Sequence, residues 1–569
     1  MNRIFHSIWN RALGAWVAAP ETARAASAGS ASCVLAAPTT PHRPHLGWRP
    51  TALALAVAAW VPGVAMAVPV GPNIQVSGDV RNAGTLVTTT PTSPWNLGNN
   101  ALAVGAQTTS SVDIAGGASV TSSSVYLGGN DGTVNVQELG SRLTTQGLYV
   151  GYGGSGRLHI TNGGAVSSAY THVSESPNET AIVFVSGSGS TWTNSGTLLL
   201  GVHGIGVLNI VQGGQVKTGA ITLGSGTPAT ARGIVQLYGN AITGRGVLET
   251  TQLTKRTSTS TLVFDGGILR ASAHQSDFLK GFTGLTLEAG GAYFDTNGYD
   301  IGVGTAFASP AGGGLFKQGA GTLTLRGAST YSGGTTISGG TLVAANASAL
   351  GTGDVTVGTG AALEVASGTA LAVGGDLTFQ PGSTYRVYAN PNGSASSVHA
   401  SGTATLAGSV LHVGPKSDFA VATPYTILTA DGGIAAGTQF DAVQSSYAFL
   451  TATLGYSPTS VTLTLQGVED FGRRVNTANQ QTTVRNIQKL GSSSPLYQRL
   501  VQTEDSQATA VANSLSGDAH ATVGGSLVGL GAFAPSVSQS HLRNNLTAGM
   551  TPGAAVAQSD GPLPASAWP

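Results

Sequence analysis

The chain has 569 residues, more than one compact core usually holds, so several domains or a repeat array are expected. Only 9% of the residues are charged and 83 are glycine, whereas hydrophobic residues make up 41% and recur at regular spacing, which argues against disorder. The 25 Lys and Arg residues balance the 25 Asp and Glu residues without forming a basic stripe, so nucleic acid is not expected as a partner.

The first readable element is an apolar segment near the N-terminus. Residues 51–67, TALALAVAAWVPGVAMA, end in the small-x-small pattern that signal peptidase cleaves. Pro62 and Gly63 interrupt the segment, which is also short for a transmembrane helix. We therefore expect a signal peptide cleaved after Ala67 and export through the inner membrane. Cys33 is the single cysteine and precedes this segment, so a mature protein without disulfides is expected.

The N-terminal extension ahead of this segment, MNRIFHSIWNRALGAWVAAPETARA, occupies residues 1–25. It resembles the extended signal peptide region of type V secretion proteins of Gram-negative bacteria. The resemblance implies an exported protein with an extended signal peptide over residues 1–67. The matching positions are Asn2, Arg3, Ile4, Phe5, Ile8, Trp9, Asn10, Gly14, Trp16, Val17, Glu21 and Arg24.

The body of the chain repeats itself. LYVGYGGSGRLHITNGGAV at 148–166 aligns without a gap with LLLGVHGIGVLNIVQGGQV at 198–216. A second motif, seen at 134–147 and again at 183–196, lies between them, so each unit has about 20–25 residues, the length of a solenoid turn. Hydrophobic residues alternate within a unit, as in Leu158-x-Ile160, which is typical of a strand with one inward face.

These repeats predict an all-β fold, a single-stranded right-handed parallel β-helix (solenoid), over residues 68–375. A single turn cannot bury its inward face, but stacked turns cover one another. We expect some 16–20 turns, spanning roughly 75–95 Å at about 4.8 Å each. The rival all-β architectures are a string of sandwiches and a membrane barrel, and aromatic residues, at 6%, are too few for the girdles of a barrel. Helical spacing is absent from residues 70–465, which excludes α-solenoids.

Residues 314–351 form the most diagnostic stretch and predict three short strands separated by Gly corners. The stretch resembles the passenger-associated transport repeat of autotransporters. This resemblance implies secretion by that pathway and dependence on the outer-membrane translocation machinery. The matching positions are Lys317, Gly319, Gly321, Thr322, Leu323, Thr324, Leu325, Tyr331, Gly333, Gly334, Thr335, Thr336, Gly339, Gly340, Thr341, Leu342, Leu350 and Gly351.

The C-terminal third changes character twice. Residues 376–466 carry bulkier side chains, which suit a cap over the last turn of a solenoid, and they resemble the autochaperone region of passengers. Residues 467–569 are rich in polar helix formers, and Val484, Ile487 and Leu490 are spaced as one helical face. This part resembles the helical linker that precedes the translocator barrel. The barrel itself is not recognisable, so we expect a truncated frame, a fragment, or a protein that needs a separate pore.

No catalytic, cofactor-binding or metal-binding residues are predicted. Ser155 and Ser188 lie between glycines, which is turn chemistry, and His159 takes an outward, solvated position. Asn130-Asp131-Gly132 fits a type I′ turn better than a calcium repeat. His172 and His203 also lie in or beside the repeats. We expect the acidic residues of the turns to stay unpaired and not to recur at the spacing of the turns: Asp131, Glu138, Glu175, Asp265, Glu288 and Asp295.

The sequence therefore favours a non-catalytic exported passenger, an adhesin or interaction scaffold that binds host-surface glycans or proteins. The alternatives are a β-helix enzyme that acts on polysaccharide with carboxylates clustered on one face, and a non-functional truncated autotransporter. The expected location is the outer membrane, cell surface or medium when a translocator is available, and the periplasm otherwise. No cofactor is expected.

Overall fold

The computed structural model describes residues 5–10, 15–20, 71–226, 231–389, 395–414 and 423–517, in two units, Met1–Val68 and Pro69–Pro569. In the first unit, β1 (Phe5–Asn10) and β2 (Ala15–Pro20) form an antiparallel hairpin. The predicted signal-peptide core at 51–67, its cleavage position and Cys33 lie outside the described residues, as do residues 518–569 of the predicted linker.

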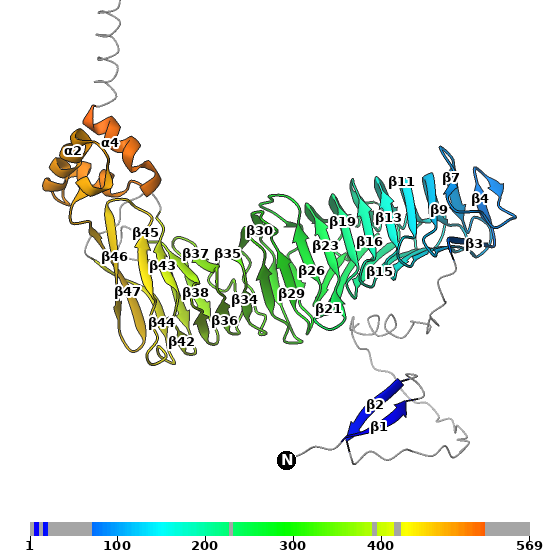
Figure 1. Cartoon of the computed structure of the whole chain (residues 1–569), viewed down its shortest axis with the longest axis horizontal. Helices are drawn as coiled ribbons and strands as arrows, with labels where there is room; N and C mark the ends of the chain where they lie inside the picture. The colour runs from blue at the N-terminus through cyan, green and yellow to red at the C-terminus, as the bar shows by residue number, and fades with distance from the viewer. Residues whose placement is uncertain are drawn as a thin grey trace, which may run out of the picture. The chain divides into compact units, whose positions relative to one another are not determined.

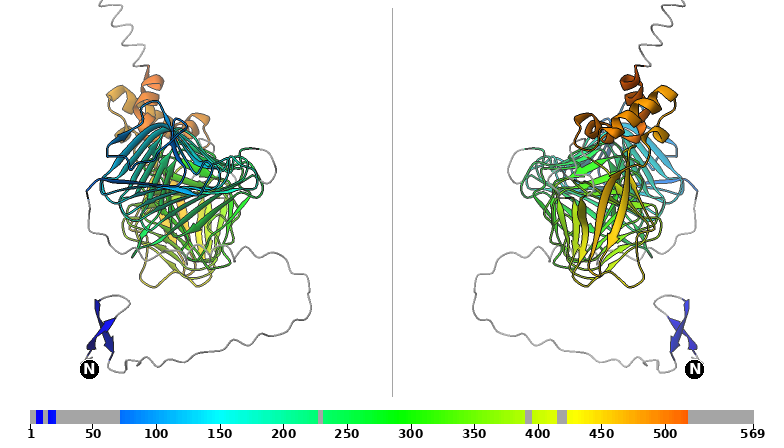
Figure 2. Two further views of the ribbon diagram at one scale, coloured as in Figure 1. Left: turned by 90° about the vertical axis from the view of Figure 1, so that its right-hand side faces the viewer. Right: turned by 90° about the vertical axis from the view of Figure 1, so that its left-hand side faces the viewer.

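The second unit is a parallel β-solenoid of about 13 turns, which confirms the predicted fold class. Its strands follow one another along the stack in chain order (Figure 1), and a view along the stack shows the turns one behind another (Figure 2). The predicted 16–20 turns were too many, because antiparallel strands at both ends and long corners use part of the chain. At about 4.8 Å per turn, the stack spans roughly 60 Å.

Strands of successive turns form three parallel ladders, which we call faces 1, 2 and 3. Face 1 contains β8 (Ser110–Ala115), β10 (Gly132–Gln137), β12 (Gly156–Thr161), β15 (Thr180–Ser186), β18 (Ile205–Val211), β21 (Arg232–Asn240), β25 (Thr261–Asp265), β28 (Gly284–Thr286), β31 (Ala306–Ala308), β38 (Ala370–Val373), β41 (Ser397–Ala400) and β44 (Pro424–Ala430).

Face 2 contains β6 (Trp95–Asn96), β9 (Ser119–Gly128), β11 (Arg142–Tyr152), β13 (Ala165–Ser168), β16 (Thr191–Asn194), β19 (Gln215–Thr218), β23 (Val247–Thr250), β26 (Ile268–Ala271), β29 (Ala292–Asp295), β32 (Leu315–Gln318), β34 (Thr335–Ile337), β36 (Val355–Val357), β39 (Leu377–Phe379) and β42 (Ala404–Thr405). The strands β9 and β11 are long enough to continue onto face 3. The other strands of face 3 are β7 (Ala101–Val104), β14 (Tyr170–Val173), β17 (Leu198–Leu200), β20 (Ala220–Leu223), β24 (Gln252–Lys255), β27 (Leu279–Lys280), β30 (Ile301–Val303), β33 (Thr322–Leu325), β35 (Gly340–Ala344), β37 (Ala361–Val365), β40 (Thr384–Val387), β43 (Ser409–His412) and β45 (Ala442–Ser445).

Aliphatic side chains fill the interior and follow one another in register from turn to turn. Strand alternation directs every second residue inward, so each turn covers the apolar residues of its neighbours. Burying one such side chain contributes roughly 1.5–3 kcal/mol. The column on face 1, in which no residue is more than 2% exposed, consists of Val112, Val134, Leu158, Val183, Leu208, Val235 and Leu262.

The sequence repeat corresponds to two turns of the stack. Leu148 pairs with Thr171 one turn later, and Thr171 pairs with Leu198 in the turn after that. The aligned copies at 148–166 and 198–216 therefore lie two turns apart, which agrees with units of about 20–25 residues. The transport repeat differs from its prediction, because it forms four strands, β32 to β35, instead of three.

Antiparallel strands close both ends of the stack. At the N-terminal end, β3 (Asn73–Ser77) pairs with β8 and β4 (Val80–Asn82) pairs with β7 and with β5 (Thr85–Leu86). At the other end, β47 (Ser460–Gly467) lies between β44 and β46 (Leu450–Tyr456). A short hairpin joins β21 to β22 (Gly244–Arg245). Covered ends matter because an open sheet edge recruits other strands.

A short helical region follows β47, as the fold class predicted. It consists of η2 (Phe471–Arg474), α2 (Ala478–Lys489), α3 (Pro495–Val501), η3 (Asp505–Gln507) and α4 (Ala508–Ser516). Its apolar core joins residues 447–450 of the solenoid, so the helices pack onto the last turn. Val484 and Ile487 are buried there, whereas Leu490, which is spaced on the same helical face but follows the last residue of α2, is 52% exposed. Among the described helices, none has the length and apolar character of a membrane span.

Candidate functional site

A cluster of aromatic side chains covers the outer surface of face 3 in the N-terminal part of the stack. Tyr126 on β9, Tyr149 on β11 and His172 on β14 occupy equivalent positions in three consecutive turns. The residues on either side of each are buried, so alternation directs these three rings outward. Tyr152 at the end of β11 and Tyr170 at the start of β14 complete what we call the tyrosine platform.

The rings of the platform pack against one another. Tyr126 and Tyr149 stack with centroids 4.7 Å apart and planes inclined by 8°, and Tyr152 meets Tyr126 edge-on at 5.0 Å. Tyr170 and His172 meet Tyr149 edge-on, at 6.0 and 5.3 Å. Tyr152 is nevertheless 51% exposed and Tyr170 is 42% exposed. The platform therefore presents apolar ring surface to solvent.

Polar groups and one glycine position these rings. A hydrogen bond with Tyr170, together with burial, raises the pKa of the Tyr149 phenol above its ordinary value. His172 Nδ1 contacts the carboxylate of Glu175. A Cβ on Gly147 would stand 2.7 Å from the phenol oxygen of Tyr170, so the missing side chain lets Tyr170 lie close against β11.

A second outward column runs along face 2, with one residue per turn. Its N-terminal members are exposed and carry hydroxyl groups, and we call them the hydroxyl column: Thr121, Thr144, Ser167 and Thr193. The strands β9 and β11 hold members of both features, since Thr121 precedes Tyr126 and Thr144 precedes Tyr149 on one continuous strand. The hydroxyl column therefore flanks the tyrosine platform.

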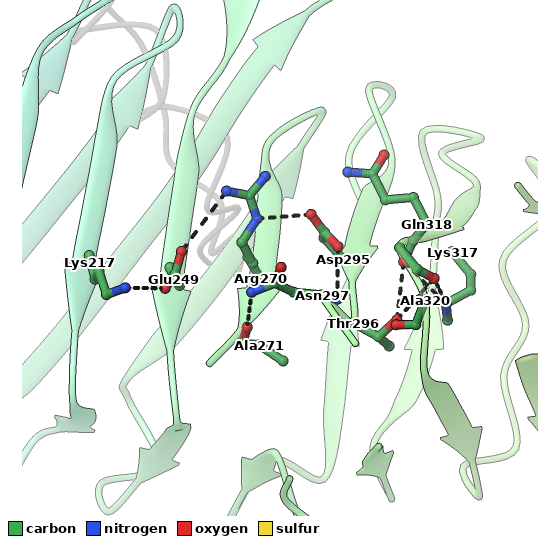
Figure 3. A network of polar contacts seen from close by, with 11 residues as sticks. Lys217, Glu249, Arg270, Ala271, Asp295, Thr296, Asn297, Lys317, Gln318 and Ala320 are labelled. Atoms are coloured by element: carbon green, nitrogen blue, oxygen red, sulfur yellow. Dashed lines mark hydrogen bonds and ion pairs between the residues drawn. The ribbon is translucent and has the colours of Figure 1, made fainter. Parts of the chain in front are cut away.

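The same column continues as a ladder of alternating charges (Figure 3). Lys217 Nζ lies 2.8 Å from Glu249, and this hydrogen bond raises the pKa of Lys217. Arg270 lies 3.9 Å from Glu249 and 2.8 Å from Asp295. Each charge therefore faces an opposite charge one turn away, which joins four turns and opposes a shift in their register.

The transport repeat buries a lysine. Lys317 follows Leu315 in the inward phase of β32, and its Nζ donates to the carbonyl oxygens of Gln318, Gly319 and Gly339 at 3.1, 2.8 and 2.8 Å. Burial lowers the pKa of Lys317 to about 8, and Asp295 opposes this lowering. The ammonium group satisfies corner carbonyls of two successive turns, which is a structural role.

Two acidic residues stack on face 1, contrary to the expectation that none recur at the spacing of the turns. Tyr238 pairs in register with Asp265, and Phe264 bridges to Leu287, which places Glu288 one turn beyond Asp265. Burial and these two carboxylates raise the pKa of the Tyr238 phenol. Asp265 also accepts a hydrogen bond from the Gly290 amide at 2.8 Å.

The other acidic residues singled out in the sequence all have partners, and those of Asp131, Glu138 and Asp295 lie one turn away. Asp131 contacts Arg157 at 2.6 Å, and Glu138 accepts from the Gly116 amide at 3.0 Å. Glu175 contacts His172, and Asp295 pairs with Arg270, so the expectation that these residues are unpaired was wrong. The sequence conceals the cross-turn pairs, because a corner of variable length separates each acidic residue from its partner one turn away.

The serine and histidine candidates have ordinary surroundings. Ser155 donates to Glu179 at 2.7 Å, and Ser188 is exposed in a turn. His159 lies in the predicted outward position, but it is partly covered, because Asn135 lies 3.0 Å from its Nδ1 and its ring meets Phe184 edge-on. Burial lowers the pKa of His159. Within the described residues, no group of three or more His, Cys, Asp or Glu is arranged to hold a metal ion.

The sequence interpretation missed the tyrosine platform, although a signal for it was present. Tyr126, Tyr149 and His172 follow one another at intervals of 23 residues, each between two inward residues. The repeat alignment concealed the pattern, because the copy two turns after Tyr149 has Leu199 at this position.

Comparisons with known proteins match two segments that the sequence interpretation singled out, the N-terminal extension and the transport repeat. Residues 1–41 match the family described as Extended Signal Peptide of Type V secretion system, and residues 315–344 match the Passenger-associated-transport-repeat. The chain is also similar to the uncharacterized lipoprotein YdeK of Escherichia coli (strain K12), with 32% identity over 166 residues. That match covers 27% of this chain and 12% of YdeK, so the chain spans a small part of the relative's length.

Proposed function

We propose that the chain is an exported passenger of the autotransporter type, and that it acts at the cell surface or in the medium as a non-catalytic interaction scaffold. The transport repeat and the extended signal peptide imply dependence on outer-membrane translocation machinery. The proposed partners are glycans or proteins on a host surface, which makes the passenger an adhesin.

The tyrosine platform is the observation that supports this proposal. A chain with only 6% aromatic residues gathers four tyrosines and a histidine on one outward surface, with Tyr152 and Tyr170 about half exposed. Tyrosine combines a large apolar ring with a polar tip, and it is enriched where proteins bind partners. Exposed apolar clusters on a soluble protein commonly mark interaction sites.

The charged groups support a non-catalytic scaffold. Glu249 and Asp295 share Arg270, and Asp131 pairs with Arg157, so these carboxylates hold turns together. A glycosidase-type mechanism needs a pair of carboxylic groups that face a substrate and divide the acid and base roles. Carboxylates committed to cross-turn ion pairs are poorly suited to such roles.

Cell-surface display and binding test the proposal together. The full chain with an epitope tag is expressed in a Gram-negative host, with and without a co-expressed outer-membrane translocator, and binding of these cells to epithelial monolayers is measured. We expect adhesion that depends on surface display and is lost on protease shaving. Display without any gain in adhesion would contradict the adhesin proposal.

The stacked acidic residues Asp265 and Glu288 favour a second candidate, an enzyme that acts on polysaccharide. They lie one turn apart beside Tyr238, on the face where a substrate would contact both. The release of reducing ends from neutral and acidic polysaccharides by the full chain distinguishes the candidates. We expect none, whereas release that disappears in Asp265→Asn or Glu288→Gln would establish the enzyme.

A further inference from the structure

We propose that the tyrosine platform and the hydroxyl column beside it form a binding site for a neutral oligosaccharide. The inference rests on the proposed function, since it assigns a ligand class to that interaction surface. Three observations support the inference: the chemistry of the aromatic rings, the polar groups around them, and the poor fit of other ligand classes to this surface.

The rings supply the apolar half of such a site. The face of an aromatic ring carries negative charge density, and it attracts the partially positive C–H groups on the flat face of a pyranose. Tyr152 and Tyr170 offer half-exposed surface for this contact. The mutual stacking of Tyr126 and Tyr149, together with Gly147 beneath Tyr170, holds the rings in place, so little conformational entropy is lost on binding.

The surrounding side chains supply the polar half. Thr144, Gln146 and Tyr149 are consecutive outward residues of β11, and both Thr144 and Gln146 are exposed. Thr144 on face 2 lies five residues from Tyr149 on face 3, or at most roughly 16 Å at about 3.3 Å per residue, because the strand changes face at the consecutive inward residues Gly147 and Leu148. An oligosaccharide is needed to reach both columns. Its hydroxyls would find hydroxyl and amide partners along the strand, and the carboxylate of Glu175 at the edge of the platform disfavours acidic sugars.

Other ligand classes fit this surface poorly. A peptide that adds a strand is rejected, because the strands β11 and β14 already pair on both sides. A quaternary ammonium group needs a slot between rings, but Tyr126, Tyr149 and Tyr152 pack directly on one another at 4.7–6.0 Å. A phosphate ligand would be repelled by the carboxylate of Glu175. The one basic side chain in the column of Tyr126, Tyr149 and His172 is the histidine, and Glu175 already contacts it.

Titration calorimetry of the full chain tests the proposal. The probes are maltohexaose, cellohexaose, chitohexaose and lacto-N-tetraose, with polygalacturonate and sialyllactose as acidic counterparts. We expect the wild type to bind at least one neutral probe more tightly than either acidic probe. Tyr152→Ala and Tyr170→Ala should each weaken that binding about tenfold, the scale of one lost aromatic contact. Gly147→Ala should weaken it as well, because the new methyl group displaces the Tyr170 phenol while every ring is retained.

Phe316→Ala is the matched control. Phe316 stacks on Tyr293 with centroids 4.2 Å apart and planes inclined by 6°, the same arrangement as in the platform. The guanidinium of Arg245 covers Tyr293 at 3.6 Å, so the Tyr293 ring is not free to stack on a sugar, and the pair lies on face 2, outside the tyrosine platform. Binding should be unchanged in Phe316→Ala. Thermal melting of all variants separates loss of binding from loss of folding.

Two results would overturn the assignment. The first is no heat of binding with any neutral probe, and the second is binding that persists in Tyr152→Ala and Tyr170→Ala variants that melt like the wild type. Either result leaves the scaffold proposal standing if the cells still adhere through another surface. In that case cells that display Tyr152→Ala and Tyr170→Ala would adhere as well as cells that display the wild type. Failure of the saccharide site and failure of the scaffold are therefore distinguishable.

Discussion

Raising the pH above 8 is expected to stabilise the protein through Lys317. Its ammonium group is buried against three carbonyl oxygens, and burial lowers its pKa to about 8. In the unfolded chain the pKa of a lysine is about 10.4, so between these values the unfolded state binds more protons and stability rises with pH. The slope rises from about half of 1.4 kcal/mol per pH unit at pH 8 toward the full value, so from about pH 8 to about pH 9.5 the gain in unfolding free energy is about 1.5 kcal/mol.

Urea denaturation followed by far-UV circular dichroism measures this gain, with Lys317→Met as the reference. Methionine has a similar length and does not titrate, so the variant should show a flatter dependence over the same interval. Burial raises the pKa of the Tyr331 and Tyr385 phenols. These two groups therefore lower the stability of the folded protein only above about pH 10, and they do so equally in the wild type and in Lys317→Met. Equal pH dependences in the two proteins would refute the reasoning, because Lys317 would then be as solvated when folded as when unfolded.

Three further predictions concern the packing of the stack. Arg270→Met should destabilise the protein by about 1–2 kcal/mol. In a double-mutant cycle, the double variant with Asp295→Asn should lose less stability than the sum of the two single variants, because the two side chains form one ion pair between turns. Additive effects would mean that the ladder is not coupled. Leu208→Ala should lower the unfolding free energy, measured by urea denaturation, by about 2–5 kcal/mol, since it leaves a cavity in a fully buried column. Ile487→Ala should lower the thermal stability of the helical region, whereas Leu490→Ala should change it by less than about 0.5 kcal/mol, because only Ile487 is buried.

Alternation in the sequence was sufficient to predict the interior. The pattern Leu158-x-Ile160 implies one inward and one outward side, and both residues are fully buried in the solenoid. The alignment of Leu148 with Leu198 gave the length of the unit, because both residues belong to one inward column. These predictions succeeded because they depend on local backbone geometry and on one repeated distance.

Contacts between turns were much harder to predict, because the corners differ in length. Lys217 and its partner Glu249 are 32 positions apart, whereas Glu249 and Arg270 are only 21 apart. No single period aligns these charges, so the ladder on face 2 was invisible in the sequence. Asp265 and Glu288, by contrast, are 23 positions apart, within the predicted length of a unit, so their stacking could have been predicted from the sequence. The burial of Lys317 was foreshadowed by its inward phase, but its carbonyl partners come from corners that only the folded chain brings together.

The correspondence of the 50-residue repeat with two complete turns has a consequence for how such a protein changes in length. An in-frame duplication of 148–197 would return the chain to the same face and the same inward phase, since Leu148 and Leu198 share one column. Each duplication would extend the molecule by roughly 10 Å, or two strand spacings. Both terminal closures would remain intact. Reach can therefore evolve in fixed increments, independently of what the surface binds.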